Sequence, residues 1–346
     1  MLKVGIIGAS GFIGSRTREI FCVENIAQVK AIARSSSSLS HLAHTNLESC
    51  VADALDTTSL ENALADCDMA IYCAAGSPWF LKQTAVSTYK AAEKARVRRL
   101  IYLSTAVVHG QAPPVGTNES SPLNDRQFIA YNNAKVWVER KLLQLSEKGT
   151  TEVVMLRPGI VVGPGSTWIT GFANSLLSGT AYLVDQGQGI CNSIYIDNLV
   201  HAMRLALTAS DVNRQAFLVG DAETVTWADL YQPIAHSLGT DLSQLTNINC
   251  PEFTPTWKEQ LREGLKNSNL LGSLLHFLSS QRKQHLQFPQ QPALNQEMIW
   301  LYQCQYKLPH QKAQEQLNYS PIVSFEEACD RTKEWLASEG YPLISA

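Results

Sequence analysis

Short, nearly continuous apolar runs alternate with longer amphipathic stretches along the first half of the chain. The apolar runs predict six β-strands, at residues 2–7, 29–33, 50–52, 69–74, 99–104 and 152–156. The intervening stretches predict helices at about 12–21, 60–65, 80–95 and 131–147. Strands that are apolar on both faces and alternate with helices indicate a parallel sheet covered on both sides. The expected fold class is therefore α/β, a doubly wound parallel sheet, or Rossmann fold.

The pattern changes after Gly163, where segments become more irregular and richer in helix and proline. We expect residues 1–165 to form the Rossmann dinucleotide-binding core. Residues 166–346 would form mainly a smaller, helix-rich substrate-binding region, with some segments returning to the core. Residues 252–300, which include the run LLGSLLHFL at 270–278, predict a helical region. Its apolar face would be either ordinary core or the wall of an apolar pocket.

Composition narrows the class of protein. The 346 residues are 45% hydrophobic and 17% charged, which is typical of a well-packed globular protein. A net charge of -3 gives no electrostatic reason to expect nucleic acid or an anionic membrane surface as a partner. The eight cysteines lack metal-ligand spacing, so we expect reduced, buried thiols and no metal site. A strand-like start and the lack of any apolar run of roughly 18 residues favour a cytoplasmic protein without a membrane span.

The segment GASGFIG directly follows the first predicted strand and opens a helix. Gly8 permits a tight turn, Gly11 lets the backbone approach a pyrophosphate, and Gly14 lets the helix pack close to the strand. The helix N-terminus would face the negative charge. The motif predicts a dinucleotide site formed by Gly8, Ser10, Gly11, Phe12, Ile13 and Gly14.

The end of the second strand bears on the choice of cofactor. Proteins that bind NAD usually carry an acidic residue about 20 residues after the glycine motif, which holds the ribose 2′-hydroxyl. Here the strand ends in Arg34 and Ser35, without a carboxylate. An arginine can stack on adenine and form a forked contact with a 2′-phosphate, and the serine can donate to it as well. NADP(H) is favoured and NAD stays an option; the alternative is that Arg34 is an ordinary exposed loop residue.

Two further strand ends suit the same cofactor. Asp53 follows the third strand and could accept a hydrogen bond from the adenine amino group, although an aspartate after a strand is usually a turn former. The fourth strand ends in small residues that would let the cofactor lie close to the backbone. These are Ala74, Ala75 and Gly76.

Tyr131 and Lys135 lie four residues apart in a predicted helix, so their side chains share one face. A free phenol has a pKa of about 10, and a nearby ammonium group lowers that value. The pair could therefore act as an acid or base near neutral pH. The hydroxyl residues Ser104 and Thr105, which follow the fifth strand, strengthen this interpretation.

Together these features resemble the extended short-chain dehydrogenase/reductase superfamily, of the epimerase/dehydratase type. The resemblance runs from Lys3 to the C-terminus. Its motifs, besides the glycine turn, are YCAA (72–75), LSTAVVHG (103–110), YNNAK (131–135), LRPGIVVGPG (156–165), YIDNLVHA (195–202) and the closing segment 312–336.

The resemblance implies a role for each catalytic residue. Tyr131 would be the acid/base, Lys135 would lower the pKa of Tyr131 and hold the nicotinamide ribose, and Thr105 would hydrogen-bond the substrate oxygen. His109 stands where the superfamily often has tyrosine, and is either catalytic or a pocket-lining or hydrogen-bonded histidine. The residues expected near the nicotinamide are Pro158, Gly159 and Ile160.

Departures from the superfamily pattern bear on the substrate. Ala106 and Val107 replace the Asp-Glu pair of sugar-nucleotide dehydratases, and Cys191 replaces an arginine that often binds diphosphate. Pro158 stands where sugar-nucleotide enzymes commonly have asparagine. The stretch 187–202 is more similar to the 3β-hydroxysteroid dehydrogenase branch, and other features also fit the dihydroflavonol-reductase-like branch.

Three functions stay open. The leading one is an NADP(H)-dependent oxidoreductase acting on a secondary alcohol or ketone of a small, fairly apolar substrate. The second is a nucleotide-sugar epimerase with tightly held NAD. The third is a dinucleotide-sensing regulator without catalysis, against which the intact set Thr105, Tyr131 and Lys135 argues. The partner expected is a small-molecule substrate, and a homodimer is an option.

Overall fold

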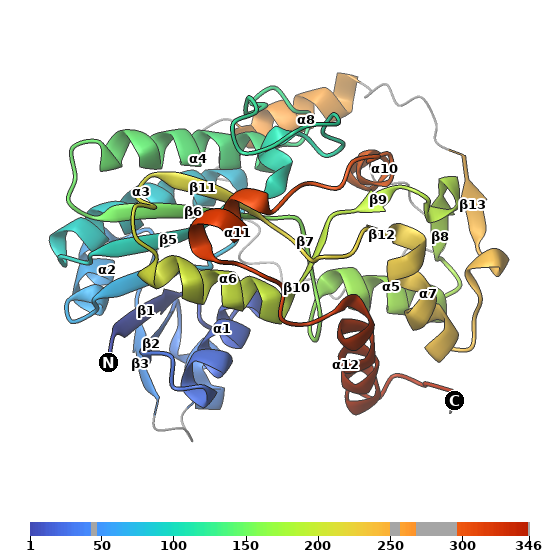
Figure 1. The fold of residues 1–346 in the computed structure, drawn as a ribbon, viewed down its shortest axis with the longest axis horizontal. Coiled ribbons are helices and arrows are strands. Elements are labelled where there is room, and N and C mark those ends of the chain that lie inside the picture. The colour runs from blue at the N-terminus through green and yellow to red at the C-terminus, as the bar shows by residue number, and fades with distance from the viewer. Residues whose placement is uncertain (43–46, 250–256, 268–295, 345–346) are drawn as a thin grey trace.

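A seven-stranded parallel sheet forms the centre of the N-terminal half (Figure 1). The computed structural model describes residues 1–42, 47–249, 257–267 and 296–344. The strands follow the order β11-β6-β5-β4-β1-β2-β3, and every neighbouring pair is parallel. The doubly wound α/β fold is thereby confirmed. The strand bounds are β1 (Lys3–Ile7), β2 (Gln28–Ala33), β3 (Glu48–Val51), β4 (Met69–Tyr72), β5 (Arg99–Leu103), β6 (Glu152–Pro158) and β11 (Gln215–Val219).

The six strands expected from the sequence are all present, with ends that differ by up to two residues from those expected, and the sheet has one strand more. The edge strand β3 begins two residues earlier than expected, and its residues alternate between half-buried and exposed. The opposite edge strand, β11, was not expected, because it follows β6 only after a long excursion of the chain. It pairs with β6 in the register Gln215↔Val154.

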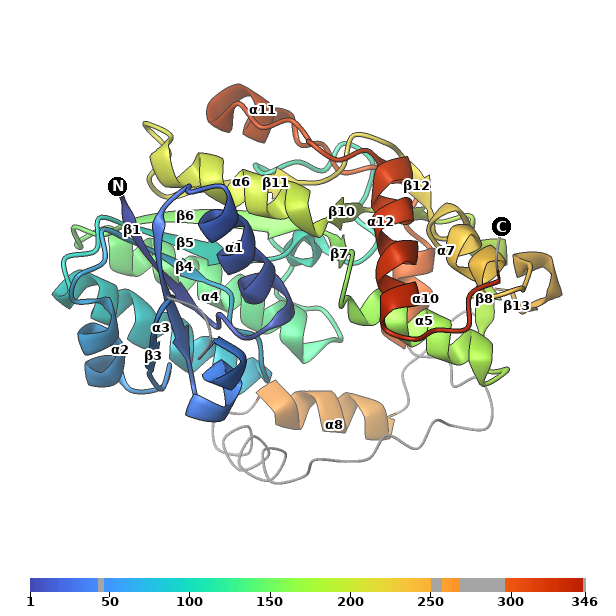
Figure 2. The ribbon, with the colours of Figure 1, turned by 90° about the horizontal axis from the view of Figure 1, so that it is seen from below.

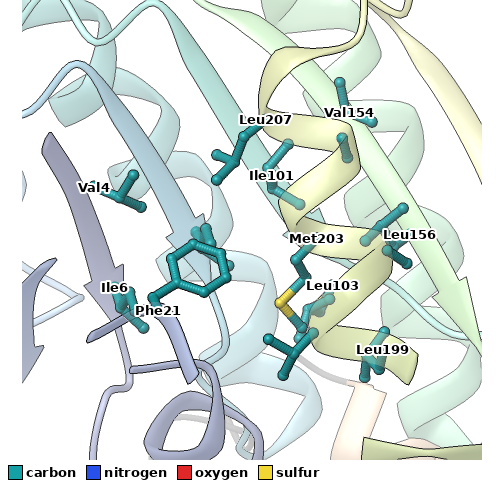
Figure 3. Close-up of a cluster of buried hydrophobic side chains, with 14 of the residues drawn as sticks. Val4, Ile6, Phe21, Ile101, Leu103, Val154, Leu156, Leu199, Met203 and Leu207 are labelled. Atoms are coloured by element: carbon teal, nitrogen blue, oxygen red, sulfur yellow. The ribbon is translucent and has the colours of Figure 1, made fainter. Parts of the chain in front are cut away.

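Helices cover both faces of this sheet. One face carries α2 (Thr57–Leu64), α3 (Pro78–Lys94) and α4 (Ala130–Ser146). The other carries α1 (Phe12–Val23), α6 (Ile196–Thr208) and α11 (Gln311–Leu317). Figure 3 shows this second interface, where Phe21 of α1 and Leu199, Met203 and Leu207 of α6 pack over strand residues such as Ile101. Three segments from the second half of the chain therefore belong to the core of the N-terminal half, namely α6, α11 and β11.

A second hydrophobic cluster lies beside the sheet, to the right in Figure 1. Its helices are α5 (Thr167–Leu177), α7 (Trp227–Ser237), α10 (Gln296–Tyr302) and α12 (Phe325–Ser338). Its short strands pair two by two, in the pairs β7 (Ile160–Val162) with β10 (Ser193–Tyr195), β9 (Ile190–Cys191) with β12 (Val225–Thr226), and β8 (Tyr182–Val184) with β13 (Thr246–Ile248). Aliphatic side chains and several aromatic rings form its core, and the rings of Phe172 and Tyr231 stack with centroids 3.8 Å apart.

The helix α8 (Trp257–Asn267) lies over α3 and α4, as Figure 2 shows from below. The run at 270–278 lies outside the described residues. In the part of the chain that the structure describes, no helix is both long and apolar enough to cross a membrane.

Polar side chains of the motif YIDN hold the two hydrophobic regions together. The Asp221 carboxylate accepts hydrogen bonds from the Tyr195 amide at 2.9 Å and from Asn198 Nδ2 at 2.8 Å. Asn198 Oδ1 in turn accepts from the backbone amides of Ile322 and Val323. This buried network fixes the start of α6 against the C-terminal segment, so the role of Asn198 in the structure is architectural.

Candidate active site

The glycine turn between β1 and α1 is closed against the end of β4. Gly8 has φ +85°, a conformation that favours glycine, and a Cβ there would lie 2.8 Å from the Ala74 nitrogen. A Cβ on Gly14 would collide with the carbonyl oxygen of Gly8. Gly11 is the N-cap of α1, and no side chain caps the helix N-terminus. The first amide groups of α1 are therefore available to an anion, as a pyrophosphate would require.

This turn lies where the sheet reverses its direction of growth. From β1 the chain builds β2 and β3 on one side and continues with β4 on the other. In open parallel sheets, ligands bind at such a point, outside the carboxyl ends of the strands. Ser10 and Gly11 are exposed there, and Phe12 and Ile13 line a pocket. The residues present thus fit a dinucleotide.

The residues expected around the adenine end follow β2 and β3. Arg34 is exposed directly after β2. Ser35 is half-buried, and its hydroxyl lies 3.0 Å from that of Ser37 in the same loop. Asp53 is exposed, and its carboxylate accepts a hydrogen bond from the Leu55 amide at 2.9 Å, which makes it a turn former. These three residues do not line the pocket described below, so they would contact only the far end of an extended cofactor.

The proposed catalytic residues come from β5 and α4. Thr105 caps a short 3-10 helix at Ala106–His109, with its hydroxyl accepting from the Val107 amide at 3.4 Å. Tyr131 lies in the first turn of α4, and Lys135 lies one turn later. The Lys135 Nζ atom is 5.8 Å from the centroid of the Tyr131 ring. The structure therefore brings the side chains of Tyr131 and Lys135 close together; Tyr131 and Thr105 line one pocket, and Lys135 does not line it.

Lys135 is only 4% exposed, and its ammonium group is held by buried partners. Nζ donates to the Leu103 carbonyl at 2.7 Å and to the Tyr102 hydroxyl at 3.4 Å, and it lies 4.9 Å from the Tyr102 ring centroid. Burial lowers the pKa of Lys135 to about 8, while Glu139 and Cys73 act to raise it. The side chain can therefore change its charge close to neutral pH.

A pocket of about 580 Å³ opens between the sheet and the second hydrophobic cluster. Phe12, Ile13 and Ala75 reach it from the glycine-turn side, and Thr105 and Tyr131 form part of its floor. None of the described residues that line it carries a charged side chain. Its walls are largely apolar and include Ile160, Val161, Trp168, Ile190, Trp227, Leu301 and Leu308.

Pro158, Gly159 and Ile160 lead from β6 into β7 along this pocket. Pro158 is buried at the end of β6, and Gly159 and Ile160 line the pocket. A Cβ at Gly159 would collide with the carbonyl oxygen of Asn192, which accepts a hydrogen bond from the Ile160 amide at 2.8 Å. The close approach of these two backbones therefore requires glycine. At the end of β4, Ala75 lines the pocket, whereas Ala74 and Gly76 do not.

His109 is a buried, hydrogen-bonded histidine. Its Nε2 accepts from Arg157 Nη1 at 3.1 Å, so Nδ1 carries the proton and donates to the Pro122 carbonyl at 3.3 Å. Burial and the Arg157 charge lower the pKa of the imidazole. His109 does not line the pocket, so the geometry favours the architectural alternative over the catalytic one.

Several pocket residues were not found from the sequence. Trp168, Trp227 and Leu301 form walls although more than 130 positions separate the first from the last. No local pattern marks such residues, because only packing brings them together. Glu139 does not line the pocket, but this buried residue did carry a signal, since it lies four residues after Lys135 on the same helix face.

Comparisons with known proteins agree with this geometry. A protein family described as NAD(P)H-binding matches residues 8–170. A decarboxylating sterol-4-alpha-carboxylate 3-dehydrogenase of Schizosaccharomyces pombe is 24% identical over 258 residues, which cover 72% of this chain and 69% of that protein. A second relative is the 4-hydroxy-2-methyl-3-oxo-4-farnesyl-3,4-dihydroquinoline-1-oxide ketoreductase of Stigmatella aurantiaca. It is 24% identical over 232 residues, which cover 64% of this chain and 69% of that protein.

Among solved structures, a UDP-glucose 4-epimerase of Thermotoga maritima matches with a TM-score of 0.70 at 17% sequence identity. The match covers 98% of this chain and 99% of the epimerase chain. That likeness supports the fold alone. The glycine turn at the switch point and the matched family define an NAD(P)-binding Rossmann protein. The relatives are named as dehydrogenases, reductases and epimerases, so the resemblance of this chain to the extended short-chain dehydrogenase/reductase superfamily is confirmed, and the chain is identified as an NAD(P)-dependent enzyme.

Proposed function

We propose that the protein is an NADP(H)-dependent oxidoreductase acting on a secondary alcohol or ketone of a small, uncharged and fairly apolar substrate. One observation carries the proposal: Thr105 and Tyr131 line a pocket whose described walls are largely apolar and carry no charged side chain. In this proposal residues 1–165 mainly hold the dinucleotide, and residues 166–346 supply most of the substrate walls.

The chemistry assigned to the chain is proton transfer and orientation. When bound, the nicotinamide supplies or accepts the hydride. In ketone reduction, the Tyr131 hydroxyl gives its proton to the carbonyl oxygen; in alcohol oxidation, the phenolate takes the hydroxyl proton. The Lys135 ammonium stabilises that phenolate, and the Thr105 hydroxyl hydrogen-bonds the same substrate oxygen.

The neutral pocket favours this function over epimerisation of a nucleotide sugar. A diphosphate carries negative charge, and its burial requires cationic partners. At position 191, where sugar-nucleotide enzymes often have arginine, the chain has a buried cysteine. The names of the curated relatives do not decide between the two functions, because they describe a sterol dehydrogenase and a ketoreductase but also, at 25% identity, a UDP-glucose 4-epimerase of Vibrio cholerae.

The preference for NADP(H) rests on Arg34. An exposed guanidinium directly after β2 suits a forked contact with a 2′-phosphate, and the Ser35 hydroxyl lies next to it in sequence. NAD(H) would place an uncharged hydroxyl at this point and gain no ion pair.

A substrate screen tests the proposed function. Uncharged ketones of increasing apolar size would be incubated with NADPH, and UDP- and dTDP-sugars with NAD, under the same conditions. We expect oxidation of NADPH with at least one ketone class, seen as loss of nicotinamide absorbance, and no sugar conversion by NMR. Epimerisation of a sugar nucleotide without ketone reduction would contradict the proposal.

A further inference from the structure

A buried carboxylate without a role in the proposed chemistry lies among the segments that carry the proposed site. Glu139, on α4, is 0% exposed. Arg157 on β6 binds it with two hydrogen bonds, from Nη2 at 2.6 Å and from Nε at 3.0 Å. The hydroxyl of Ser104, at the end of β5, donates to the same carboxylate. A forked arginine contact of this kind fixes direction as well as distance.

The partners of Glu139 belong to the segments that carry the active site. Ser104 directly precedes Thr105, and Arg157 directly precedes the turn at 158–160. Lys135 lies one helical turn before Glu139, on the same face of α4. Through one carboxylate, the end of β5, the end of β6 and the catalytic helix are therefore tied to each other.

The Arg157 guanidinium extends this connection to a fourth segment. Its Nη1 donates to His109 at 3.1 Å and to the Glu119 carbonyl at 3.4 Å. His109 ends the short 3-10 helix that begins directly after Thr105. The loop on which Thr105 lies is thus held at its start by Ser104 and at its end by His109.

We propose that Glu139 is a positioning residue for the reaction. Its carboxylate fixes Thr105, Lys135 and the turn at 158–160 relative to one another, and it supplies negative charge beside the Lys135 ammonium. The proposal rests on the function proposed above, because it assumes that Tyr131 and Lys135 act on a substrate.

Two opposing influences, burial and the charge of Glu139, set the pKa of Lys135. Burial lowers the pKa of Lys135, and the Glu139 charge is the largest influence that opposes this. Loss of the carboxylate would therefore lower the pKa further, and less ammonium would be present at neutral pH. The described ionisable groups around Lys135 and around the ion pair include Tyr72, Cys73, Tyr102, His109, Glu119, Tyr131, Glu139, Arg157 and Lys312.

The variant Glu139→Gln tests both parts, because it removes the charge and nearly keeps the shape. Lysine labelled with carbon-13 at Cε reports each lysine's titration by NMR, and loss of one resonance in Lys135→Met identifies Lys135. We expect its midpoint, about 8 in the wild type, to fall by on the order of one pH unit in Glu139→Gln. We also expect a kcat lower by about tenfold or more with little change in KM, and an alkaline decline that begins at lower pH.

Two comparison variants separate this role from general stability. Glu152→Gln removes a carboxylate that pairs with Arg99 at 2.6 Å, at the opposite end of the same two strands. It should leave the Lys135 midpoint and the kcat profile as in the wild type. Glu139→Asp keeps the carboxylate charge. The titration midpoint of Lys135 in this variant should therefore lie close to the wild-type value, even where turnover stays low.

A folded Glu139→Gln variant with wild-type Lys135 midpoint and wild-type kcat profile would overturn the proposal. Should Glu139→Gln fail to fold because it leaves Arg157 unpaired, the double variant Glu139→Gln/Arg157→Gln removes that charge too and is judged by the same readings. If the wild type shows no Tyr131-dependent turnover, the proposed function falls. The NMR reading then stands alone, and an unchanged Lys135 midpoint overturns the role of Glu139.

Discussion

The two regions that meet at the pocket present different parts of the polypeptide to a ligand. On the sheet side, the glycine turn offers backbone, because any Cβ at Gly8 or Gly14 would collide with neighbouring main chain. On the other side, α5, α7 and α10 offer large side chains, with the Trp168 and Trp227 rings 5.7 Å apart. A backbone site suits a cofactor shared by many enzymes. A side-chain site can be changed residue by residue, so we expect substrate specificity to reside there.

Arg34→Ala should weaken the cofactor side of the pocket and leave the substrate side intact. If the guanidinium contacts a 2′-phosphate, its loss removes about 1.5–3 kcal/mol of NADPH binding, roughly 10- to 150-fold in Kd. NADH binding should stay nearly unchanged. Titration of nicotinamide fluorescence measures both. Arg204→Ala, on the exposed side of α6, is the matched control; equal losses for NADPH and NADH would contradict the account.

Trp168→Ala should break the substrate side and leave the cofactor side intact. Removing a large apolar surface from the pocket should weaken substrate binding by about 1.5–3 kcal/mol, which raises KM while the Kd for NADPH stays the same. Steady-state kinetics and cofactor titration separate the two effects. Trp257→Ala, at a tryptophan that is 68% exposed on α8, serves as the control. Parallel losses in KM and cofactor Kd would mean that the two sides do not act independently.

The pH dependence of turnover should follow the charge state of Lys135. Burial lowers the pKa of Lys135 to about 8. The side chain is therefore fully charged well below pH 8, and it loses its charge as the pH rises through this value. Turnover that needs the charge should therefore fall about tenfold per pH unit above about 8. A kcat profile measured between neutral pH and pH 10 checks this. A profile that is flat across pH 8 to 10 would show that the Lys135 charge is not required.

Thr105→Val should have the smallest effect, because it removes one hydrogen bond to the substrate oxygen. We expect a loss of about 0.5–1.5 kcal/mol, or roughly 2- to 12-fold, in kcat/KM. Thr170→Val on α5 removes a threonine hydroxyl that donates to the Ser166 carbonyl within the helix and is the matched control. A loss as large as that of the Tyr131 variant below would give Thr105 a larger role than orientation.

The sequence predicted the sheet better than the pocket, for a physical reason. Strands buried on both faces, such as β4 and β5, are apolar at every position, and this pattern is readable in a single segment. The edge strand β3 has one row of half-buried residues and gave a poorer boundary. The strand β11 is as apolar as the others, but its place beside β6 follows from the return of the chain rather than from local pattern.

The candidate site shows the same contrast between what a local sequence pattern indicates and what only tertiary packing determines. Tyr131 and Lys135 are neighbours on one helix, so their spacing alone placed both side chains on one face. The contacts around Lys135 could not be read in this way, because its partners Leu103 and Tyr102 come from β5 and the Glu139 partner Arg157 comes from β6. Sequence spacing thus pointed to the proposed reacting groups, and tertiary packing determines the surroundings that set their charge and orientation.

The most direct measurement of the central claim is the turnover of Tyr131→Phe with a ketone that the wild type reduces. The variant keeps the ring and loses only the oxygen that would transfer the proton, so NADPH binding should stay nearly intact while kcat falls by about 10²- to 10⁴-fold. Tyr341→Phe, which removes a hydroxyl 3.2 Å from Asn174 Oδ1, controls for the loss of a phenol elsewhere. Wild-type kcat in Tyr131→Phe would contradict the proposed mechanism, even though the fold would stand.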